Sequence, residues 1–317
     1  MFRTALSFDM RSAPFGAPQA DLYSAALEMI AYADAQGIDN VIISEHHASE
    51  DGYIPVPALL AAAAGARTHR IAITLGALVL PLHDPIEVAE QIAVTDLICG
   101  GRLHPVLVAG YARQEFAAFR KPFHARGELM DRGLEVLTRA LAGERFKDGD
   151  REVFVRPLPL STPPRIYVGG GVPAAARRAA RFGAGFWPMS NELIPVYVDA
   201  CRDLGRAPGP IMTTAVGVHL AEDVEQGWED VGPYVLHQIR SYAAISAAAG
   251  DSHSPMHGLD TAEAIRNSGV IQVLTPDQCV ELARVRPIAL VPLTAGLPPQ
   301  IGWRSLKLFV AEVLPQI

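Results

Sequence analysis

The sequence predicts a single (β/α)8 barrel, the TIM barrel fold, with an insertion before the last strand. Apolar runs of strand length alternate with amphipathic helical stretches, eight such strands can be placed, and the chain has 317 residues. Strands that alternate with helices form parallel sheets, and barrels of about 200 to 400 residues fold as one unit. We therefore expect residues 1–317 to form one domain.

The expected strands are apolar runs bounded by turn residues. They cover residues 3–9, 41–44, 71–80, 103–109, 165–168, 185–189, 211–220 and 288–293. The expected helices cover residues 21–36, 58–68 and 85–98, further segments up to 141, and a helix opened by Gly169–Gly171 that runs to 182. In the first helix, apolar residues recur at helical spacing from Leu22 to Ala33, and Gly37 ends it.

Two segments interrupt this alternation. Residues 156–165 are rich in proline and are expected to form a surface connection before the fifth strand. The chain between the seventh and eighth strands is longer than one β/α unit needs. It contains an alanine-rich helix around 235–249 and a polar stretch at 250–258, which we interpret as a loop or lid over the site.

Composition points to a soluble cytoplasmic protein. Half of the residues are hydrophobic, 19% are charged and the net charge is −7, so a nucleic-acid partner is not expected. No apolar run is long enough to span a membrane, and the N-terminus lacks the pattern of a signal peptide. Cys99, Cys201 and Cys279 are scattered and odd in number, which suits a reducing compartment and small buried side chains.

The strongest functional signal follows the second expected strand. There, Glu45, His46 and His47 come directly after the apolar run Val41-Ile42-Ile43. Catalytic groups of β/α barrels lie at the carboxyl ends of strands, and histidine changes charge near neutral pH. We favour a reactive site over the alternative, a buried histidine pair that only satisfies local hydrogen bonds.

Three other strand ends contain glycine and carry possible chemistry. Residues 75–81 include Gly76 and Ala77, where small side chains would admit a flat ligand or meet a packing requirement. Residues 108–111 place Tyr111 at the mouth of the barrel, unless they form an ordinary turn. Residues 167–173 carry a glycine turn into a helix, whose free N–H groups can bind phosphate. This turn has neither the dinucleotide spacing nor the lysine of a Walker motif.

A metal site is the less favoured interpretation of the same histidines. Glu45, His46, His47, His83 and Asp84 could be imagined around one ion. Neighbouring side chains in an extended strand point to opposite faces, so His46 and His47 would not share it. No His-x-His or His-Glu-x-x-His motif occurs. We therefore expect no metal and keep a metal-dependent hydrolase as an alternative.

Taken in order, these motifs resemble the bacterial luciferase-like monooxygenases. The resemblance rests on residues 44–47, 75–85, 96–103, 111–116 with Phe119, 167–171, 292–296 and 313–315. It covers nearly the whole chain and implies a barrel that binds a flavin, FMN or the deazaflavin F420, at its carboxyl face. It also implies a homodimer that receives reduced flavin from a separate flavin reductase.

The resemblance assigns roles to individual residues. His46 matches the catalytic histidine beside the flavin, and Gly76-Ala77 match a frequent non-proline cis peptide under the flavin ring. Gly170, Gly171 and Val172 match the turn that faces the phosphate. The full set of expected cofactor-binding residues is Glu45, Gly76, Ala77, Gly110, Tyr111, Gly169, Gly170, Gly171 and Val172.

The chain departs from the family pattern at the phosphate site. Ala109 stands where tight FMN binders have an arginine, and residues 172–175 lack the frequent serine or threonine. A charge-assisted phosphate contact is therefore missing, unless Arg113 or Arg165 replaces it.

The sequence thus predicts a monooxygenase that uses reduced flavin and O₂ on a small organic substrate. One alternative is an F420-dependent hydride-transfer oxidoreductase on the same fold. Another is a flavin-binding protein that does not catalyse a reaction.

Overall fold

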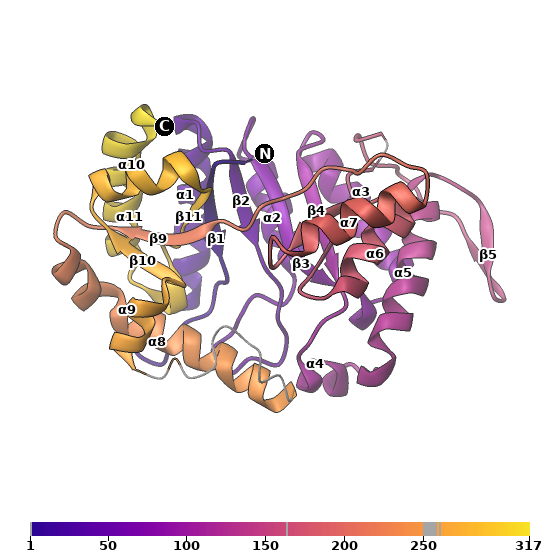
Figure 1. The fold of residues 1–317 in the computed structure, drawn as a ribbon, viewed down its shortest axis with the longest axis horizontal. Coiled ribbons are helices and arrows are strands. Elements are labelled where there is room, and N and C mark those ends of the chain that lie inside the picture. Colours follow the sequence, from indigo (N-terminus) through magenta and orange to yellow (C-terminus); the bar gives the residue numbers. More distant parts are fainter. Residues whose placement is uncertain (1, 163, 250–258, 260) are drawn as a thin grey trace.

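The computed structural model of the chain describes residues 2–162, 164–249, 259 and 261–317. Its centre is a nine-stranded sheet with the spatial order β10-β9-β11-β1-β2-β3-β4-β7-β8, in which every ladder is parallel (Figure 1). The strands are β1 (Thr4–Phe8), β2 (Asn40–Ile43), β3 (Ala72–Val79), β4 (Leu103–Val108), β7 (Tyr167–Gly170), β8 (Gly185–Pro188), β9 (Val216–Leu220), β10 (Ile271–Leu274) and β11 (Ile288–Leu290). The α/β class with a parallel sheet is confirmed.

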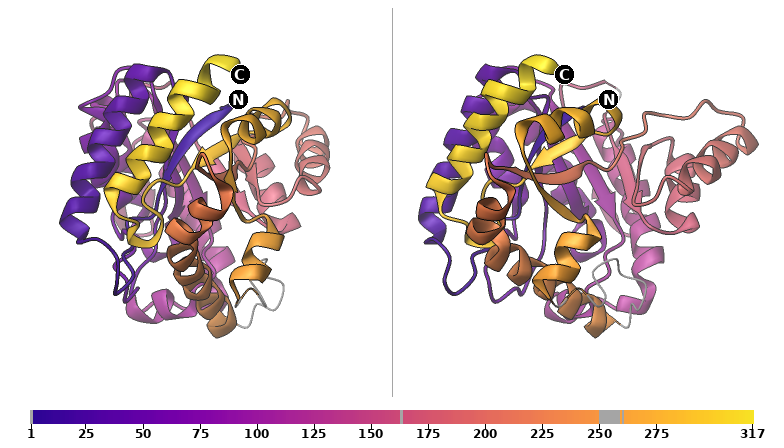
Figure 2. Two further views of the ribbon diagram at one scale, coloured as in Figure 1. Left: turned by 90° about the vertical axis from the view of Figure 1, so that its left-hand side faces the viewer. Right: turned by 60° about the vertical axis from the view of Figure 1, so that its left-hand side comes forward.

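The helices alternate with these strands and cover the sheet. They are α1 (Gln19–Gln36), α2 (Pro57–Gly65), α3 (Pro85–Ile98), α4 (Arg113–Ala118), α5 (Arg126–Leu141), α6 (Pro173–Phe182), α7 (Leu193–Asp203), α8 (Val224–Ala249), α9 (Ala262–Ser268), α10 (Pro276–Val285) and α11 (Pro299–Leu308). Helix α1 shows how the sequence determines which face of a helix is buried and where the helix ends. It buries Leu22, Met29 and Ile30 completely, and Gly37 ends it with a φ of 100° and an N–H donated to the Ala33 carbonyl. Helices α1 and α11 pack side by side on the outside (Figure 2).

The sheet differs from the expected closed barrel of eight strands. Next to β8 the chain makes only one isolated bridge, between Phe186 and Ile211, before it reaches β9. The expected strand 211–220 is regular only from Val216 onwards, so no ladder joins β8 to β9 among the described residues. Strand β10 was not expected and brings the number of strands in this sheet to nine. It pairs with β9 on the side opposite to β11. Its four residues, Ile271–Leu274, are too short a run to separate from their surroundings by pattern alone.

Two other segments depart from expectation. An antiparallel hairpin, β5 (Phe146–Asp148) and β6 (Arg151–Val153), precedes the proline-rich connection. Helix α8 begins at Val224, well before the alanine-rich stretch at 235–249. The expected polar loop at 250–258 lies outside the described residues. Within those residues, none of the helices is both long and apolar enough to cross a membrane.

The register of the strands brings the candidate residues to one edge. Ile43 lies opposite Leu75, Gly76 lies opposite Val106, and Gly169 lies opposite Trp187. Because parallel strands end in the same direction, the segments that follow β2, β4 and β7 leave the sheet together. Helices α4 and α8 lie at this carboxyl edge, at the bottom of Figure 1.

Candidate active site

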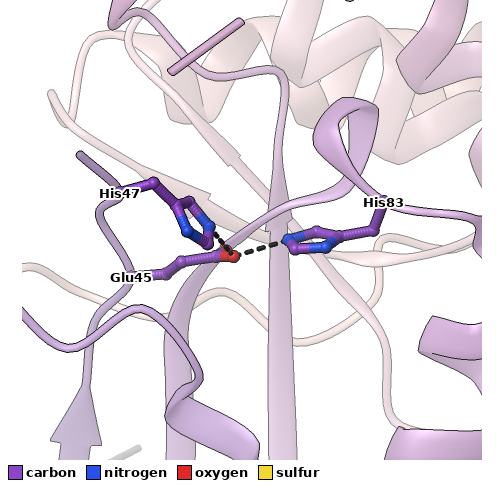
Figure 3. A group of neighbouring side chains, drawn as sticks. All are labelled: Glu45, His47 and His83. Atoms are coloured by element: carbon purple, nitrogen blue, oxygen red, sulfur yellow. Dashed lines mark hydrogen bonds and ion pairs between the residues drawn. The ribbon is translucent and has the colours of Figure 1, made fainter. Parts of the chain in front are cut away.

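The segment after β2 carries two hydrogen-bonded clusters, and the first is centred on Glu45. The Glu45 carboxylate is fully buried, and its Oε1 accepts from His47 Nε2 at 2.7 Å and from His83 Nε2 at 2.5 Å (Figure 3). Its Oε2 accepts from the Val79 amide at 2.6 Å. The cluster therefore ties the end of β2 to the end of β3.

Hydrogen bonding keeps Glu45 ionised although it is buried. Burial raises the pKa of Glu45, but the bonds from His47 and His83 outweigh it. With the Val79 amide, they lower the pKa from 4.5 to about 2. A carboxylate that accepts several N–H groups is stabilised in its charged form.

The three side chains also have the composition of a metal site. Their ligand atoms lie within 4.8 Å of one another, and two imidazoles with one carboxylate form a common zinc ligand set. Both imidazole Nε2 atoms are already directed at the same Glu45 oxygen. Hydrogen bonds therefore account for the cluster without an ion. Of the five residues that the sequence suggested around one ion, Glu45, His47 and His83 come together, whereas His46 bonds to Glu115 and Asp84 caps α3.

The second cluster is centred on Glu115 of α4, which sequence reasoning missed. Glu115 is 1% exposed, and its Oε1 accepts from His46 Nδ1 at 2.6 Å and from the His47 backbone N–H at 2.9 Å. His46 and His47 thus turn to different carboxylates, as expected for neighbours in an extended chain. The motif at residues 111–116 contains Glu115, but its contact with His46, 69 residues away, is purely tertiary.

Three tyrosine rings surround the His46 imidazole. The ring centroids of Tyr53, Tyr111 and Tyr242 lie 4.8, 5.6 and 5.9 Å from it, all in edge-to-face arrangements. The Tyr111 hydroxyl lies 3.3 Å from His46 Nε2, and the Tyr53 and Tyr242 hydroxyls are 3.0 Å apart. His46 is consequently 8% exposed, so its free edge faces an aromatic enclosure rather than bulk water.

A buried ionic network closes the other side of this enclosure. The fully buried Arg11 guanidinium lies between the rings of Tyr53 and Tyr242, at 4.5 and 4.4 Å from their centroids. It pairs with Asp9 at 3.0 Å and with Asp51 at 3.5 Å. Burial raises the pKa of Asp9, although the charge of Arg11 opposes this.

The same network holds α8 over the carboxyl edge. His237 Nε2 and the Ser241 hydroxyl, both on α8, lie 3.1 and 3.2 Å from Asp51 Oδ2, and Gln238 donates to Asp9 at 2.8 Å. Arg11 therefore links the end of β1, the loop after β2 and α8. The sequence did not single out Arg11 or Asp9, although a charged pair directly after a strand was a visible signal.

The glycine-rich strand ends lie beside these clusters. The peptide bond between Gly76 and Ala77 is cis. A Cβ at Gly76 would lie 2.5 Å from Trp187 Cζ3, so packing alone requires glycine there. Gly110 adopts a φ of 77°, and a Cβ there would lie 2.6 Å from Val79 Cγ1. The packing alternative is therefore sufficient for Gly76, and the close approach of a ligand is not needed to explain it.

The segment that was expected to bind phosphate exposes glycine backbone before α6. Gly171 and Val172 are exposed directly before Pro173, the first residue of α6. Arg113 stacks on the Phe123 ring at 4.4 Å and donates to the Ala249 carbonyl at 3.2 Å. Arg165 donates to the Gly101 carbonyl at the amino end of β4. Arg165 is thus at the opposite end of the sheet, and the idea that it replaces the missing arginine is wrong.

The role of Glu45 can be tested by how the free energy of unfolding depends on pH. Because its folded pKa is lowered, Glu45 contributes stability that is present above pH 4.5 and is lost as pH falls towards 2. We expect Glu45→Gln to lower the free energy of unfolding at neutral pH by about 3 kcal/mol and to flatten its loss on acidification. Urea unfolding at a series of pH values measures both.

The matched control is Glu90→Gln, at an exposed position of α3. It should leave the unfolding curve unchanged. An acid profile that is the same for Glu45→Gln and wild-type protein would contradict the assigned role.

Comparisons with known proteins identify the family of this chain. The family model described as luciferase-like monooxygenase matches residues 5–286. Limonene 1,2-monooxygenase from Rhodococcus erythropolis is 25% identical over 81% of this chain and 70% of that protein. The oxygenase component of the flavin-dependent trigonelline monooxygenase from Acinetobacter baylyi is 27% identical over 80% of this chain and 77% of that protein.

An F420-dependent protein is also similar to this chain. The F420-dependent glucose-6-phosphate dehydrogenase of Mycobacterium tuberculosis is 23% identical over 92% of this chain and 93% of that protein. Among solved structures, the monooxygenase RslO1 from Streptomyces bottropensis superposes with a TM-score of 0.80 at 25% identity, over 99% of both chains. With its family match over most of its length, the chain belongs to the luciferase-like monooxygenase family, whose members are flavin- or F420-dependent oxidoreductases.

Proposed function

We propose that the protein is a flavin-dependent monooxygenase that uses reduced FMN and O₂ on a small organic substrate. The observation that carries this proposal is the buried His46 imidazole, fixed by Glu115 at the carboxyl edge beside the glycine-rich strand ends. Of the two His46 ring nitrogens, Nδ1 is held by Glu115, and Nε2 faces the Tyr111 hydroxyl, so we take Nε2 as the atom that transfers a proton.

The residues at this edge fit a flavin. Exposed glycine backbone before α6 suits a phosphate, and the small residues Gly76 and Ala77 of β3 and Ala109 and Gly110 after β4 suit the close approach of a ring. We assign cofactor binding to Glu45, Gly76, Ala77, Gly110, Tyr111, Gly169, Gly170, Gly171 and Val172, with Glu45 acting through the loop that it holds. The flavin would supply the electrons that activate O₂, a chemistry that no side chain provides.

The chain's own groups supply position, proton transfer and shielding from water. His46 would exchange a proton through Nε2 while Glu115 holds Nδ1. Tyr53 from the loop after β2 and Tyr242 from α8 close the enclosure with their rings. A site that excludes water strengthens the electrostatic interactions inside it.

One departure favours F420 as the second candidate cofactor. Ala109 offers no charge to a terminal phosphate, and an F420-dependent dehydrogenase is among the relatives. On this alternative the enzyme transfers hydride and does not use O₂. The trigonelline relative is named as an oxygenase component, which supports a separate reductase if FMN is the cofactor.

The first experiment tests the cofactor and His46 together. We expect purified protein to bind FMN in a fluorescence titration. With chemically reduced FMN, O₂ and a panel that includes limonene and trigonelline, we expect an oxygenated product from at least one compound. His46→Ala should lower that turnover by about 10²–10⁴-fold and leave FMN binding intact.

The control is His124→Ala, an exposed histidine outside the site, which should behave as wild type. Binding of F420 with no binding of FMN would replace this proposal by the hydride-transfer alternative. Full turnover in folded His46→Ala protein would remove His46 from the mechanism.

A second experiment tests the phosphate site. Because backbone groups alone hold a phosphate less tightly than a charged side chain, we expect Ala109→Arg to strengthen FMN binding. A bidentate charged contact contributes about 1.5–3 kcal/mol. Equilibrium titration of both proteins decides the question, with Ala118→Arg at an exposed position of α4 as the control. Equal affinity of the Ala109→Arg and wild-type proteins would show that residue 109 does not face the phosphate.

We also propose that the protein forms a homodimer through α2 and α3. These helices pack together and expose Leu59, Val94, Leu97 and Ile98 to solvent. Large apolar side chains gathered on neighbouring helices mark an interaction surface. We expect sedimentation to give the mass of a dimer, and Leu59→Asp with Ile98→Asp to give the monomer. A wild-type monomer at micromolar concentration would contradict the proposal.

A further inference from the structure

We propose that Glu115, His46 and Tyr111 form a proton relay, in which Glu115 is a positioning residue and Tyr111 carries the proton between His46 and the bound ligand. This inference rests on the proposed function, because it specifies how His46 works there. It assigns a role to Glu115, which the sequence did not indicate, and changes the role of Tyr111 from cofactor contact to proton carrier.

The first step is the tautomer of His46. Glu115 Oε1 accepts the His47 backbone N–H at 2.9 Å, so this oxygen acts as an acceptor. The same oxygen lies 2.6 Å from His46 Nδ1, which must therefore carry a hydrogen. In the neutral imidazole, Nε2 is then a bare acceptor. The buried carboxylate fixes the ring as the aspartate of a serine-protease triad does.

The second step is the partner of Nε2. The Tyr111 hydroxyl lies 3.3 Å from Nε2 and can donate its hydrogen to it. Tyr111 is 37% exposed, whereas His46 is 8% exposed. Tyr111 is therefore the more exposed partner of this contact. On our proposal, a ligand at the carboxyl edge meets the phenol before it meets the imidazole.

The third step is the charge. Glu115 Oε2 is buried and has no hydrogen-bond partner among the described residues. A buried carboxylate with an unpaired oxygen is costly, and a positive charge nearby offsets that cost. Protonation of His46 places such a charge 2.6 Å from the other oxygen. The Glu115 carboxyl group therefore lies beside the ring on which a positive charge forms when Nε2 accepts a proton.

The proton transfer balances without an additional reagent. An O–H or N–H bond of the ligand breaks, and its proton forms a new O–H bond with the Tyr111 oxygen. The original phenol proton moves to His46 Nε2 and forms an N–H bond. The ligand loses one proton, His46 gains one, and no electrons are transferred. The reverse sequence returns a proton to the ligand.

The test uses ¹⁵N NMR of the histidine side chains in the flavin-free full-length protein. The His46 signals are assigned by their loss in His46→Gln. We expect wild-type His46 to be protonated at Nδ1 and bare at Nε2. Tyr111→Phe should shift the Nε2 resonance without changing the tautomer. Glu115→Gln should move a substantial fraction of the proton to Nε2.

Matched controls are Tyr32→Phe, on α1 against Trp303, and Glu90→Gln, both of which should leave the His46 signals unchanged. An Nε2–H tautomer in wild-type protein would overturn the relay, and so would Nε2 signals that are insensitive to Tyr111→Phe. Tyr111 is half-exposed and its ring is kept, so this variant decides the question even if Glu115→Gln fails to fold.

A second measurement separates this inference from the proposed function. With reduced FMN at saturating concentration, O₂ and any compound found to be oxygenated, Tyr111→Phe should lower turnover by about tenfold or more. Unchanged turnover would overturn the role of Tyr111. Failure of wild-type protein to bind any flavin would instead contradict the proposed function, while the tautomer result would stand on its own.

Discussion

The site depends on two buried carboxylates that hold the segment after β2 from different directions. Glu45 turns towards β3 and accepts from His47, His83 and the Val79 amide. Glu115 reaches from α4 and accepts from the His47 backbone and the His46 ring. Because a buried carboxylate must be satisfied by donors, each one fixes the imidazoles around it. The ring of His46 is therefore oriented by the fold before any ligand arrives.

Arg11 extends this order to α8. Its guanidinium lies between Tyr53 and Tyr242 and pairs with Asp9 and Asp51, so three segments meet at one buried charge. Removing one partner of such a group would leave the other charges unpaired, which is far more costly than losing an exposed ion pair. Aromatic rings thus line the enclosure around His46, and the ion pairs of Arg11 hold two of these rings, Tyr53 and Tyr242, in place. The position of the enclosure over the carboxyl edge follows from Arg11 rather than from the helical propensity of α8.

The sequence indicated local features well and tertiary partners poorly. The spacing of apolar residues and the flanking prolines and glycines located β2, β3 and α3 to within one or two residues. Both are local signals that can be read from a short stretch of sequence. It also placed the residues near Glu45 and Gly170 at one edge, since parallel strands share a direction. Glu115 and Arg11 were missed because their contacts join segments far apart in the chain. The open sheet was missed because closure depends on how residues 211–215 cross between strands.

The glycine positions show how a motif can serve packing and ligand binding at once. Gly76 is required by the Trp187 ring whether or not a flavin lies nearby, so its presence alone does not identify a cofactor site. The three described atoms nearest to a Cβ built on Gly171 all belong to the flexible Met189 side chain, the first at 3.3 Å, and Val172 beside it is exposed. Open backbone before α6 is therefore a better indicator than Gly76 of where a phosphate would bind. With Ala109 nearby in place of an arginine, the anion would depend on backbone N–H groups, which suits a flavin that is exchanged rather than permanently held.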